Sequence, residues 1–484
     1  MSDPIDEKPM KHISWWIPVV LTAMAGGMGW GIRGQYGHET GAMIPGLLVS
    51  STLVFLLIPH AGSLPVARAI AWGTVAMGIG GTMTYGQTVG LTHDTPLVGN
   101  WDALRWGMLG LAIKGGIWIG FAGLFLGMGL SGVRYRAMEV LLLLAAMLVA
   151  AYIGILVLNS PFDPENRVLP WIYFSDDWYW EPEGGFTPRR ETWGGLLFAL
   201  AVGIAYAGWV KKDRLARNLG LWGILAGAMG FPGGQSVQAS HVWNREMFKD
   251  GFLRFITTGM NPWNMMETAF GTIMGAILGL GAWLNRGKIR PVENPVGNDG
   301  KGRFPAALEW VLLAIHIPLL VAVDFGSSDW VDYLYDFGPV MAAIPLFAIT
   351  AGRRWPYLQI FTVTLIPIAG KTLRNLAYQT ESIGRPAGWI VYVIVPIVLA
   401  TAFSFWVASR GGERQGGLTF ARRALLFSTW LYFLLNYALF HYPWPWLQHH
   451  HSGLMFTVCV IGLTLGAVLL RRGRRLARPQ VTGD

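Results

Sequence analysis

The sequence predicts an all-α polytopic membrane protein with about 14 transmembrane helices, within a range of 12–14. Only 13% of the 484 residues are charged and 53% are hydrophobic, whereas roughly a quarter of the residues of a soluble domain are charged. The mean hydropathy is +0.41. Apolar runs of about 20 residues recur along the whole chain, and a helix of that length crosses a hydrocarbon core of roughly 30 Å.

The apolar runs place the predicted spans in order along the chain. They lie at 14–31, 43–59, 67–87, 106–131, 138–158, 193–210, 218–236, 265–285, 305–324, 335–351, 356–371, 387–409, 423–441 and 453–470. The first, fourth and seventh runs are so rich in glycine that a broken or re-entrant helix is an alternative to a plain span. Acidic residues precede the first run, which is atypical of a signal peptide, so we expect this helix to be retained.

Basic residues predict the orientation of these spans. If the tail RRGRRLARPQ is cytoplasmic, alternation of the loops places GVRYRAM, KKDRLAR and GRRW inside and the acidic, tryptophan-rich segment 159–191 outside. This arrangement follows the positive-inside rule, so both termini are predicted to be cytoplasmic (N-in/C-in) in a multi-pass protein of the cytoplasmic (inner) membrane. The net charge of +9 is then an orientation signal, and no nucleic-acid partner is expected.

The chain is predicted to have two membrane subdomains. Residues 1–285 are glycine-rich and contain the unusual polar motifs, whereas residues 305–470 form a plainer set of apolar runs. Between them, 286–304 is rich in Gly, Pro, Asn and charge, which is typical of a linker. The orientation makes this linker cytoplasmic, together with the basic tail 471–484.

Two segments share the pattern G-Q-[S/T]-V-x-x-[S/T]-H, namely GQTVGLTH at 86–93 and GQSVQASH at 234–241. The third and seventh spans carry the copies and run in the same direction, and a glycine-patterned helix follows each. The sequence therefore predicts a parallel repeat of helical hairpins, spans three and four against seven and eight. A looser copy, GQYGH at 34–38, ends the first span. Glycines around each copy predict an interrupted helix that lines a cavity.

Polar residues near these motifs are predicted to form one outward-facing site, because ionisable and amide side chains inside a membrane usually serve a function. The expected substrate-binding residues are Arg33, Gln35, His38, Gln87, His93, Gln235 and His241. Lys114 lies within the fourth span and Glu267 near the outer end of the eighth, which makes them a candidate charge pair. The alternatives are that the glycines serve packing, that Gln and His satisfy backbone groups, and that Lys114 snorkels outward.

This residue set favours a secondary transporter for a small hydroxyl-rich solute, such as a sugar or sugar acid. Gln offers both a donor and an acceptor to hydroxyl groups, and His changes its charge near neutral pH, which suits proton coupling. Arg33 or Lys114 would pair with an anionic group of the solute or with Glu267. The expected partners are the solute and the lipid bilayer. No cofactor and no metal are expected, although His38, His93, Asp94 and His241 are zinc ligands by type.

A membrane-embedded transferase acting on a lipid-linked or exported glycan is the second hypothesis, with Glu39, Asp94 or Asp176 as acid or base. The helix count and acidic outside loops resemble multi-span glycosyltransferases that use lipid-linked donors, with Asp176 and Asp177 as a possible counterpart of their acid. Those enzymes place the acid in the first outside loop, where this chain has Glu39. Trp171, Trp178, Trp180 and Trp193 are candidates for stacking on sugars. A structural or assembly protein is the third hypothesis.

Overall fold

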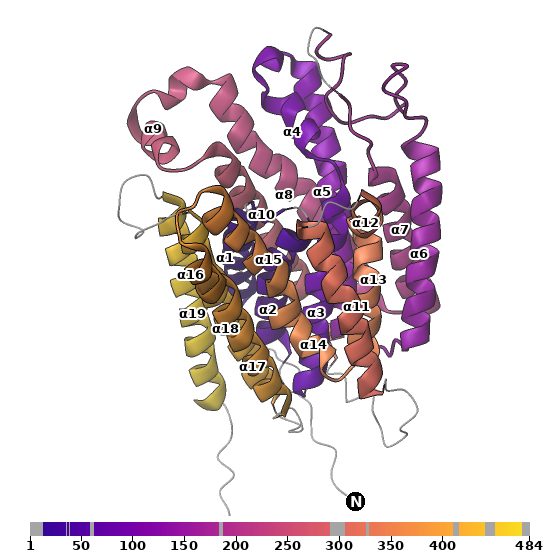
Figure 1. The fold of residues 1–484 in the computed structure, drawn as a ribbon, viewed down its shortest axis with the longest axis vertical. Helices are drawn as coiled ribbons and strands as arrows, with labels where there is room; N and C mark the ends of the chain where they lie inside the picture. The colour runs from indigo at the N-terminus through magenta and orange to yellow at the C-terminus, as the bar shows by residue number, and fades with distance from the viewer. Residues whose placement is uncertain are drawn as a thin grey trace, which may run out of the picture.

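The computed structural model is a helical bundle (Figure 1). It describes residues 13–34, 36–37, 39–58, 62–182, 187–290, 305–325, 329–409, 416–440 and 451–476. The α-helices, in chain order, are α1 Trp16–Arg33, α2 Glu39–Leu57, α3 Ser63–Ile79, α4 Gly86–His93, α5 Trp101–Leu130, α6 Ala137–Leu158, α7 Trp193–Ala205, α8 Arg214–Trp243, α9 Gly251–Thr258, α10 Pro262–Leu284, α11 Ala306–Phe325, α12 Asp329–Tyr335, α13 Gly338–Ala351, α14 Trp355–Leu358, α15 Thr364–Leu373, α16 Arg385–Gly388, α17 Val395–Ser409, α18 Gly417–Phe440 and α19 His451–Leu476.

Eight helices among the described residues are long and apolar enough to cross a membrane, or nine if α12 and α13, bent by 65° at their junction, count as one span. The eight are α2, α5, α6, α7 with the π-helical turn 206–210, α10, α11, α16 continued through 389–394 into α17, and α19. This result agrees with the expectation of a helical protein with many apolar segments, as in a multi-pass membrane protein. Each of the 14 predicted segments also falls on a helix of the structure.

Glycine contacts between antiparallel helices hold the first half of the bundle together. On α5 and α8, a Cβ added at Gly227 would lie 1.8 Å from the backbone oxygen of Gly115, and one at Gly123 would lie 2.1 Å from that of Leu219. On α1 and α10, a Cβ at Gly271 would lie 2.1 Å from the backbone oxygen of Gly26. Only glycine allows backbones to approach this closely, as at helix interfaces in membranes.

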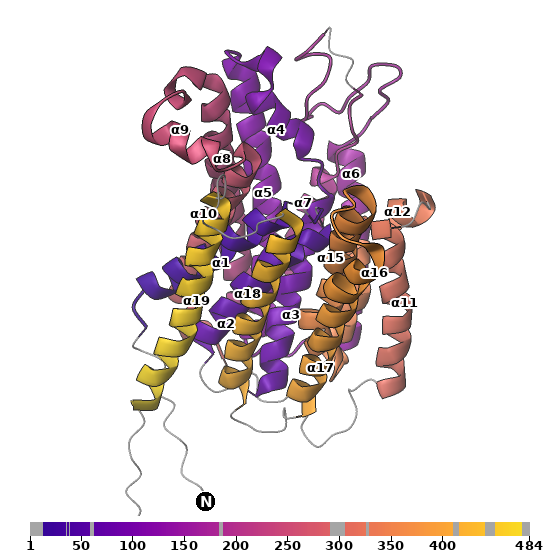
Figure 2. The same ribbon diagram turned by 60° about the vertical axis from the view of Figure 1, so that its left-hand side comes forward.

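Helix α2 is central, since every residue from Thr40 to Leu57 is buried. In contrast, α6 presents large apolar side chains outward, including Leu142, Val149 and Tyr152 at 60–65% exposure. A face of this kind suits contact with lipid. Two views of the ribbon show the long helices running side by side, with α4, α9 and the loop between α6 and α7 together at one end (Figures 1 and 2).

Helices from residues 305–470 pack directly against those from residues 1–285. The Ser63 hydroxyl lies 2.8 Å from the Tyr357 hydroxyl, and the Arg68 guanidinium donates to the carbonyl oxygens of Ile349 and Gly352 at 3.2 and 3.0 Å. The two predicted subdomains are therefore in contact in one helical bundle. The linker 286–304 lies largely outside the described residues, as does the end of the basic tail.

The two copies of the repeated motif have different conformations, so the predicted helix break is right for one copy and wrong for the other. GQTVGLTH forms the short helix α4, after α3 has ended in a 3-10 turn at Gly80–Thr82. GQSVQASH lies inside α8, which continues through Pro232 to Trp243. The reason is packing: Gly234 lies against the backbone oxygen of Met266 on α10 (2.4 Å from an added Cβ), so this glycine serves close approach of two helices.

Candidate functional site

An interrupted helix forms the centre of the candidate site. Between α3 and α4, the backbone from Gly80 to Tyr85 leaves the α-helical conformation and passes through an extended residue, Met83. Backbone groups freed in this way need partners when they are buried in an apolar bundle. Three carbonyl oxygens receive side-chain donors: Met77 from Trp118 Nε1 at 2.7 Å, Thr82 from Thr192 Oγ1 at 3.2 Å, and Thr84 from Lys114 Nζ.

One buried ion pair touches this segment from the α1 side. Arg33, at the end of α1, donates through Nη1 to Glu267 Oε1 on α10 at 2.9 Å, with only 3% and 8% of the two side chains exposed. The same nitrogen donates to the hydroxyl of Tyr85 at 2.7 Å. The guanidinium carbon also lies 5.2–5.5 Å from the ring centroids of Trp30, Tyr85 and Trp118, within the range of cation–π attraction.

A second buried ion pair touches the segment from the α5 side. Lys114 Nζ lies 2.6 Å from Glu191 Oε1, with 1% and 0% of the two side chains exposed. The ammonium group also donates to the Thr88 hydroxyl at 2.7 Å and to the carbonyl oxygen of Thr84. All three ammonium protons therefore have an acceptor, as a charge in a low-dielectric interior requires.

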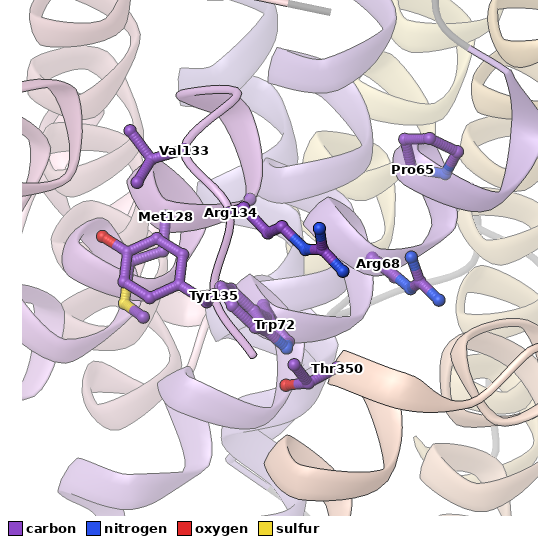
Figure 3. A pocket seen from close by; sticks show the side chains of 9 residues that line it. Pro65, Arg68, Trp72, Met128, Val133, Arg134, Tyr135 and Thr350 are labelled. Carbon is purple, nitrogen blue, oxygen red and sulfur yellow. The ribbon is translucent and has the colours of Figure 1, made fainter. Parts of the chain in front are cut away.

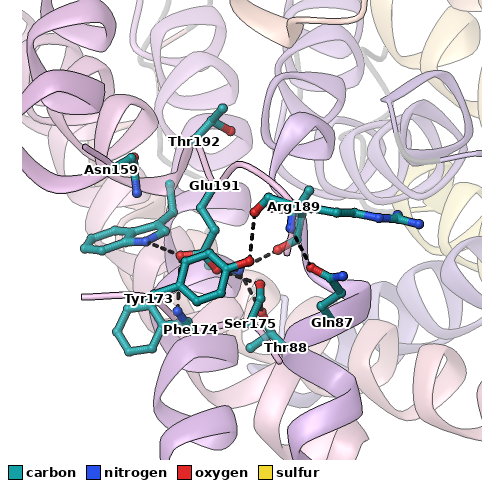
Figure 4. Close-up of polar contacts among 12 residues, drawn as sticks. Gln87, Thr88, Asn159, Tyr173, Phe174, Ser175, Arg189, Glu191 and Thr192 are labelled. Atoms are coloured by element: carbon teal, nitrogen blue, oxygen red, sulfur yellow. Dashed lines mark hydrogen bonds and ion pairs between the residues drawn. The ribbon is translucent and has the colours of Figure 1, made fainter. Parts of the chain in front are cut away.

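Glu191 comes from the loop before α7 and is held by that loop. Its carboxylate accepts hydrogen bonds from the Ser175 hydroxyl at 2.7 Å, from the backbone N–H of Phe174 at 3.1 Å and from Trp193 Nε1 at 3.0 Å. Figure 4 shows these contacts, with Gln87 and Arg189 beside them. Trp193, a predicted sugar-stacking residue, is thus buried beneath the loop and serves as a partner of Glu191.

The predicted Lys114–Glu267 pair is wrong. Each residue has a different partner, because Lys114 reaches the loop carboxylate Glu191 while Glu267 reaches Arg33 on the neighbouring helix α1. Arg33 with Glu267 was the other pairing that the sequence allowed. Glu191 was missed, since a carboxylate in a long polar loop carries no sequence signal for burial.

The two motif copies touch each other through hydrogen bonds. Gln235 of the second copy is fully buried and donates through Nε2 to the hydroxyl of Thr92, in the first copy, at 2.7 Å. Trp243, at the end of α8, donates to the carbonyl oxygen of the same threonine at 2.9 Å. Sequence analysis placed the two motifs at one site, and the structure brings them together as neighbouring packed segments.

Gln87 holds the loop between α6 and α7 against α4. Its side chain donates to the carbonyl oxygen of Thr187 at 3.2 Å and accepts from the backbone N–H of Arg189 at 3.1 Å. The backbone carbonyl oxygen of Gln87 accepts from the backbone N–H of Asp176 at 3.2 Å. Both polar atoms of the side-chain amide therefore bond to backbone groups, which matches the alternative that Gln satisfies backbone groups.

The two motif histidines have separate surroundings. His93 Nδ1 lies 2.9 Å from the carbonyl oxygen of Val89, and its ring is edge-on to Trp263 with centroids 5.8 Å apart. His241 contacts the ring of Phe248 at 4.9 Å. Gln35 and His38, the other predicted binding residues, lie outside the described residues.

An acid cluster lies at the C-terminal end of α4. Side-chain oxygen atoms of Asp94, Asp176 and Glu181 lie within 4.8 Å of one another, and among the described residues this is the group that could hold a metal ion. Hard divalent cations prefer such carboxylate oxygens. The cluster contains Asp94 but neither His93 nor His241, so it does not match the zinc ligand set considered from the sequence. Glu39, the third predicted transferase acid, lies in the first turn of α2 and is not a member.

Burial and like charges make Asp176 the unusual member of the acid cluster. Only 1% of the residue is exposed, and its Oδ2 has no hydrogen-bond partner among the described residues. Burial first, and then the charges of Glu181 and Asp94, raise the pKa of Asp176 to about 7. Burial and Asp94 also raise the pKa of Glu181. A carboxyl group that titrates near neutrality often marks a functional site.

An aromatic cleft adjoins the acid cluster on the same loop. Its walls include the indoles of Trp106, Trp171, Trp178 and Trp180, the phenols of Tyr173 and Tyr179, and the charged groups of Arg167 and Asp177. Three of these tryptophans were predicted from the sequence. Trp106 on α5 was missed, and its Nε1 fixes the wall by donating to the carbonyl oxygen of Tyr173 at 2.8 Å. Flat aromatic rings next to charged groups suit binding of a sugar or another hydroxyl-rich ring.

Breaking the Lys114–Glu191 pair should strongly destabilise the protein. Lys114→Met leaves Glu191 buried without a counter-ion, and we expect a loss of about 3–5 kcal/mol in the free energy of unfolding. The double variant Lys114→Met/Glu191→Gln should recover much of this loss because no lone charge remains. Denaturant titration in mild detergent measures both.

Lys249→Met is the matched control, since the Lys249–Glu246 pair is 62% and 82% exposed. Its effect should stay within about 0.5 kcal/mol. An equal loss in both single variants would show that burial of the Lys114 charge is unimportant.

The loop between α6 and α7 should bind to α4 more tightly at low pH. The raised pKa of Asp176, about 7, exceeds the value of about 3.9 for a free aspartate. The loop contact is therefore most stable below about pH 4, and it loses stability as the pH rises towards 7. Hydrogen exchange of residues 172–181 between pH 5 and pH 8, corrected for intrinsic rates, measures this. Asp176→Asn should reduce the pH dependence, whereas Asp102→Asn, at a side chain that is 83% exposed, should retain it in full.

No protein-family model and no curated protein sequence matches this chain.

Proposed function

We propose that the protein is a secondary transporter of the cytoplasmic membrane for a small hydroxyl-rich solute, such as a sugar or sugar acid. One observation carries the proposal: the interrupted segment 80–85 lies between two buried ion pairs and is bonded to both. Discontinuous helices near the middle of a bundle are where secondary transporters bind substrate and coupling ions. Buried charges that must stay paired are typical of such pathways.

The chemistry of the segment suits exchange of protein contacts for solute contacts. Lys114 donates to the hydroxyl group of Thr88 and to the backbone oxygen of Thr84. Arg33 donates to the hydroxyl of Tyr85. A solute with several hydroxyl groups, or with a carboxylate, offers the same kinds of acceptor. It can therefore replace one of these contacts without leaving a cation unpaired, and protonation of Glu267 would allow Arg33 to turn to a solute anion.

The proposed membrane arrangement has all 14 helical segments crossing the bilayer, with both termini in the cytoplasm. The segments that are shorter or more polar than a standard span are α1, α3, α8, α13, α14 with α15, and α18. They are closely packed in the bundle, so their polar residues need not face lipid. The aromatic cleft and the acid cluster then lie on the outer side, where the cleft provides a first binding surface for an incoming sugar.

Transport assays test this function directly. Purified protein in proteoliposomes should take up labelled sugars or sugar acids when a proton gradient is imposed. Glu267→Gln should reduce the rate by at least about tenfold, the change that corresponds to about 1.4 kcal/mol in a barrier, because the amide is permanently neutral and cannot form the ion pair with Arg33 again after the solute has left. Arg33→Lys keeps the charge but not the forked geometry, so we expect an intermediate rate.

Lys249→Met is again the control and should transport at the normal rate. Gln87→Ala and Gln235→Ala should also slow transport, through loss of the contacts that hold the loop and the two motifs. Wild-type transport in Glu267→Gln, or no uptake of any sugar or sugar acid, would contradict the proposal.

A transferase acting on a lipid-linked or exported glycan is the second candidate, favoured by the acid cluster next to the aromatic cleft. Asp176 and Asp177 are consecutive, and one belongs to the cluster while the other lines the cleft. A carboxyl group with a pKa near 7 suits general acid or base catalysis. If the same proteoliposomes consume a lipid-linked sugar donor, and Asp176→Asn abolishes the reaction, the transferase is the better interpretation.

A further inference from the structure

A small basic pocket lies at the other end of the bundle from the acid cluster. Residues of α3, of the connection between α5 and α6, and of the end of α13 line it, including Arg68, Trp72, Arg134, Tyr135 and Thr350. Figure 3 shows the guanidinium groups of Arg134 and Arg68 extending to the same side of the pocket, next to the indole of Trp72. The proposed transport function does not use this pocket.

The two arginines place positive charge at the pocket in different ways. Arg68 is fixed, since it donates to the carbonyl oxygens of Ile349 and Gly352 at 3.2 and 3.0 Å. Arg134 is exposed, and no carboxylate lies within ion-pair distance of it among the described residues. The nearby acid Asp213 is already engaged, because it accepts from the Tyr135 hydroxyl at 2.8 Å and from the backbone N–H of Ala216 at 2.9 Å.

The indole of Trp72 supplies a donor without an acceptor. Only 5% of the residue is exposed, and its Nε1 has no hydrogen-bond partner among the described residues. The rings of Phe125 and Tyr135 hold the indole edge-on, with centroids 6.1 and 5.9 Å away. Indole N–H is a donor only, and a buried donor left unpaired costs free energy. A ligand that pairs with this N–H must therefore offer an acceptor.

The size and position of the pocket narrow the chemical class of that acceptor. Its volume of about 60 Å³ accommodates a group the size of a few water molecules, so a single tetrahedral oxyanion group fits. The pocket lies between GVRYRAM and GRRW, two basic loops that the sequence places on the cytoplasmic side. Phosphate groups of anionic phospholipids lie at this level of the membrane, and basic pockets between helices bind them.

We propose that this pocket binds a phosphate group, carried by an anionic phospholipid headgroup or supplied as free phosphate. Arg134 and Arg68 provide the positive charge, and Trp72 Nε1 donates to a phosphate oxygen. Arginine suits this ligand because its planar fork of N–H donors matches phosphate geometry.

Ligand titration of the purified, delipidated full-length protein tests the proposal. The ligands are inorganic phosphate at constant ionic strength, phosphatidylglycerol in nanodiscs, and phosphatidylcholine in nanodiscs. Thermal unfolding and native mass spectrometry report binding. Arg134→Gln should weaken binding of the phosphate-bearing ligand by about tenfold, as expected for loss of a charge-assisted contact. Arg136→Gln is the matched control, since Arg136 is an exposed arginine two residues away that does not line the pocket.

The separate titrations with these ligands show whether the phosphate group comes from a lipid or from the free anion. Binding of phosphatidylglycerol but not of inorganic phosphate assigns the pocket to a lipid headgroup, and saturation by inorganic phosphate alone assigns it to the free anion. Trp72→Phe keeps the ring but removes the N–H, so it should also weaken binding while circular dichroism stays unchanged. Equal effects of Arg134→Gln and Arg136→Gln, or no binding in any arm, would overturn the proposal.

Discussion

The need to pair charges inside an apolar bundle is the constraint on which the centre of this structure depends. Arg33 and Lys114 are both buried, and each bonds to a carboxylate and a hydroxyl group, while Lys114 also bonds to a backbone oxygen. An unpaired charge at either position would cost several kcal/mol. The interruption between α3 and α4 becomes tolerable for the same reason, because side chains of α5 and of the loop before α7 supply partners for the freed carbonyl groups.

Glycine makes this arrangement of charges possible. Close contact of α5 with α8, and of α1 with α10, brings the four helices near enough for short polar side chains to bridge them. Gln235 on α8 then reaches Thr92 on α4, and Glu267 on α10 reaches Arg33 on α1. Larger side chains at Gly115, Gly227 or Gly271 would separate the helices and lengthen these contacts. The glycines of residues 1–285 thus allow the close helix packing on which the contacts of the polar residues depend.

Composition and apolar runs were sufficient to predict the helical class and the segments that become helices, because both depend on local properties of the chain. They were insufficient for the pairing of charges, which depends on how distant segments pack. Lys114 was recognisable as a buried cation, but its partner Glu191 lies 77 residues away in a polar loop. The position of the helix break was equally ambiguous, because glycines flank both motifs. Gly234 packs against α10 inside a continuous helix, whereas the helix is interrupted at Gly80, where Trp118 donates to the carbonyl oxygen of Met77.

The loop before α7 links the acid cluster to the buried centre. Asp176 of the acid cluster directly follows Ser175, whose hydroxyl donates to Glu191, the counter-ion of Lys114. The backbone N–H of Asp176 also bonds to Gln87, one residue before Thr88, which accepts from the same lysine. Repulsion within the acid cluster therefore acts on a segment that holds both an anion and a hydroxyl partner of Lys114. Under the proposed transport function, this short connection would let a change of charge in the acid cluster weaken the contacts between Lys114 and the interrupted segment.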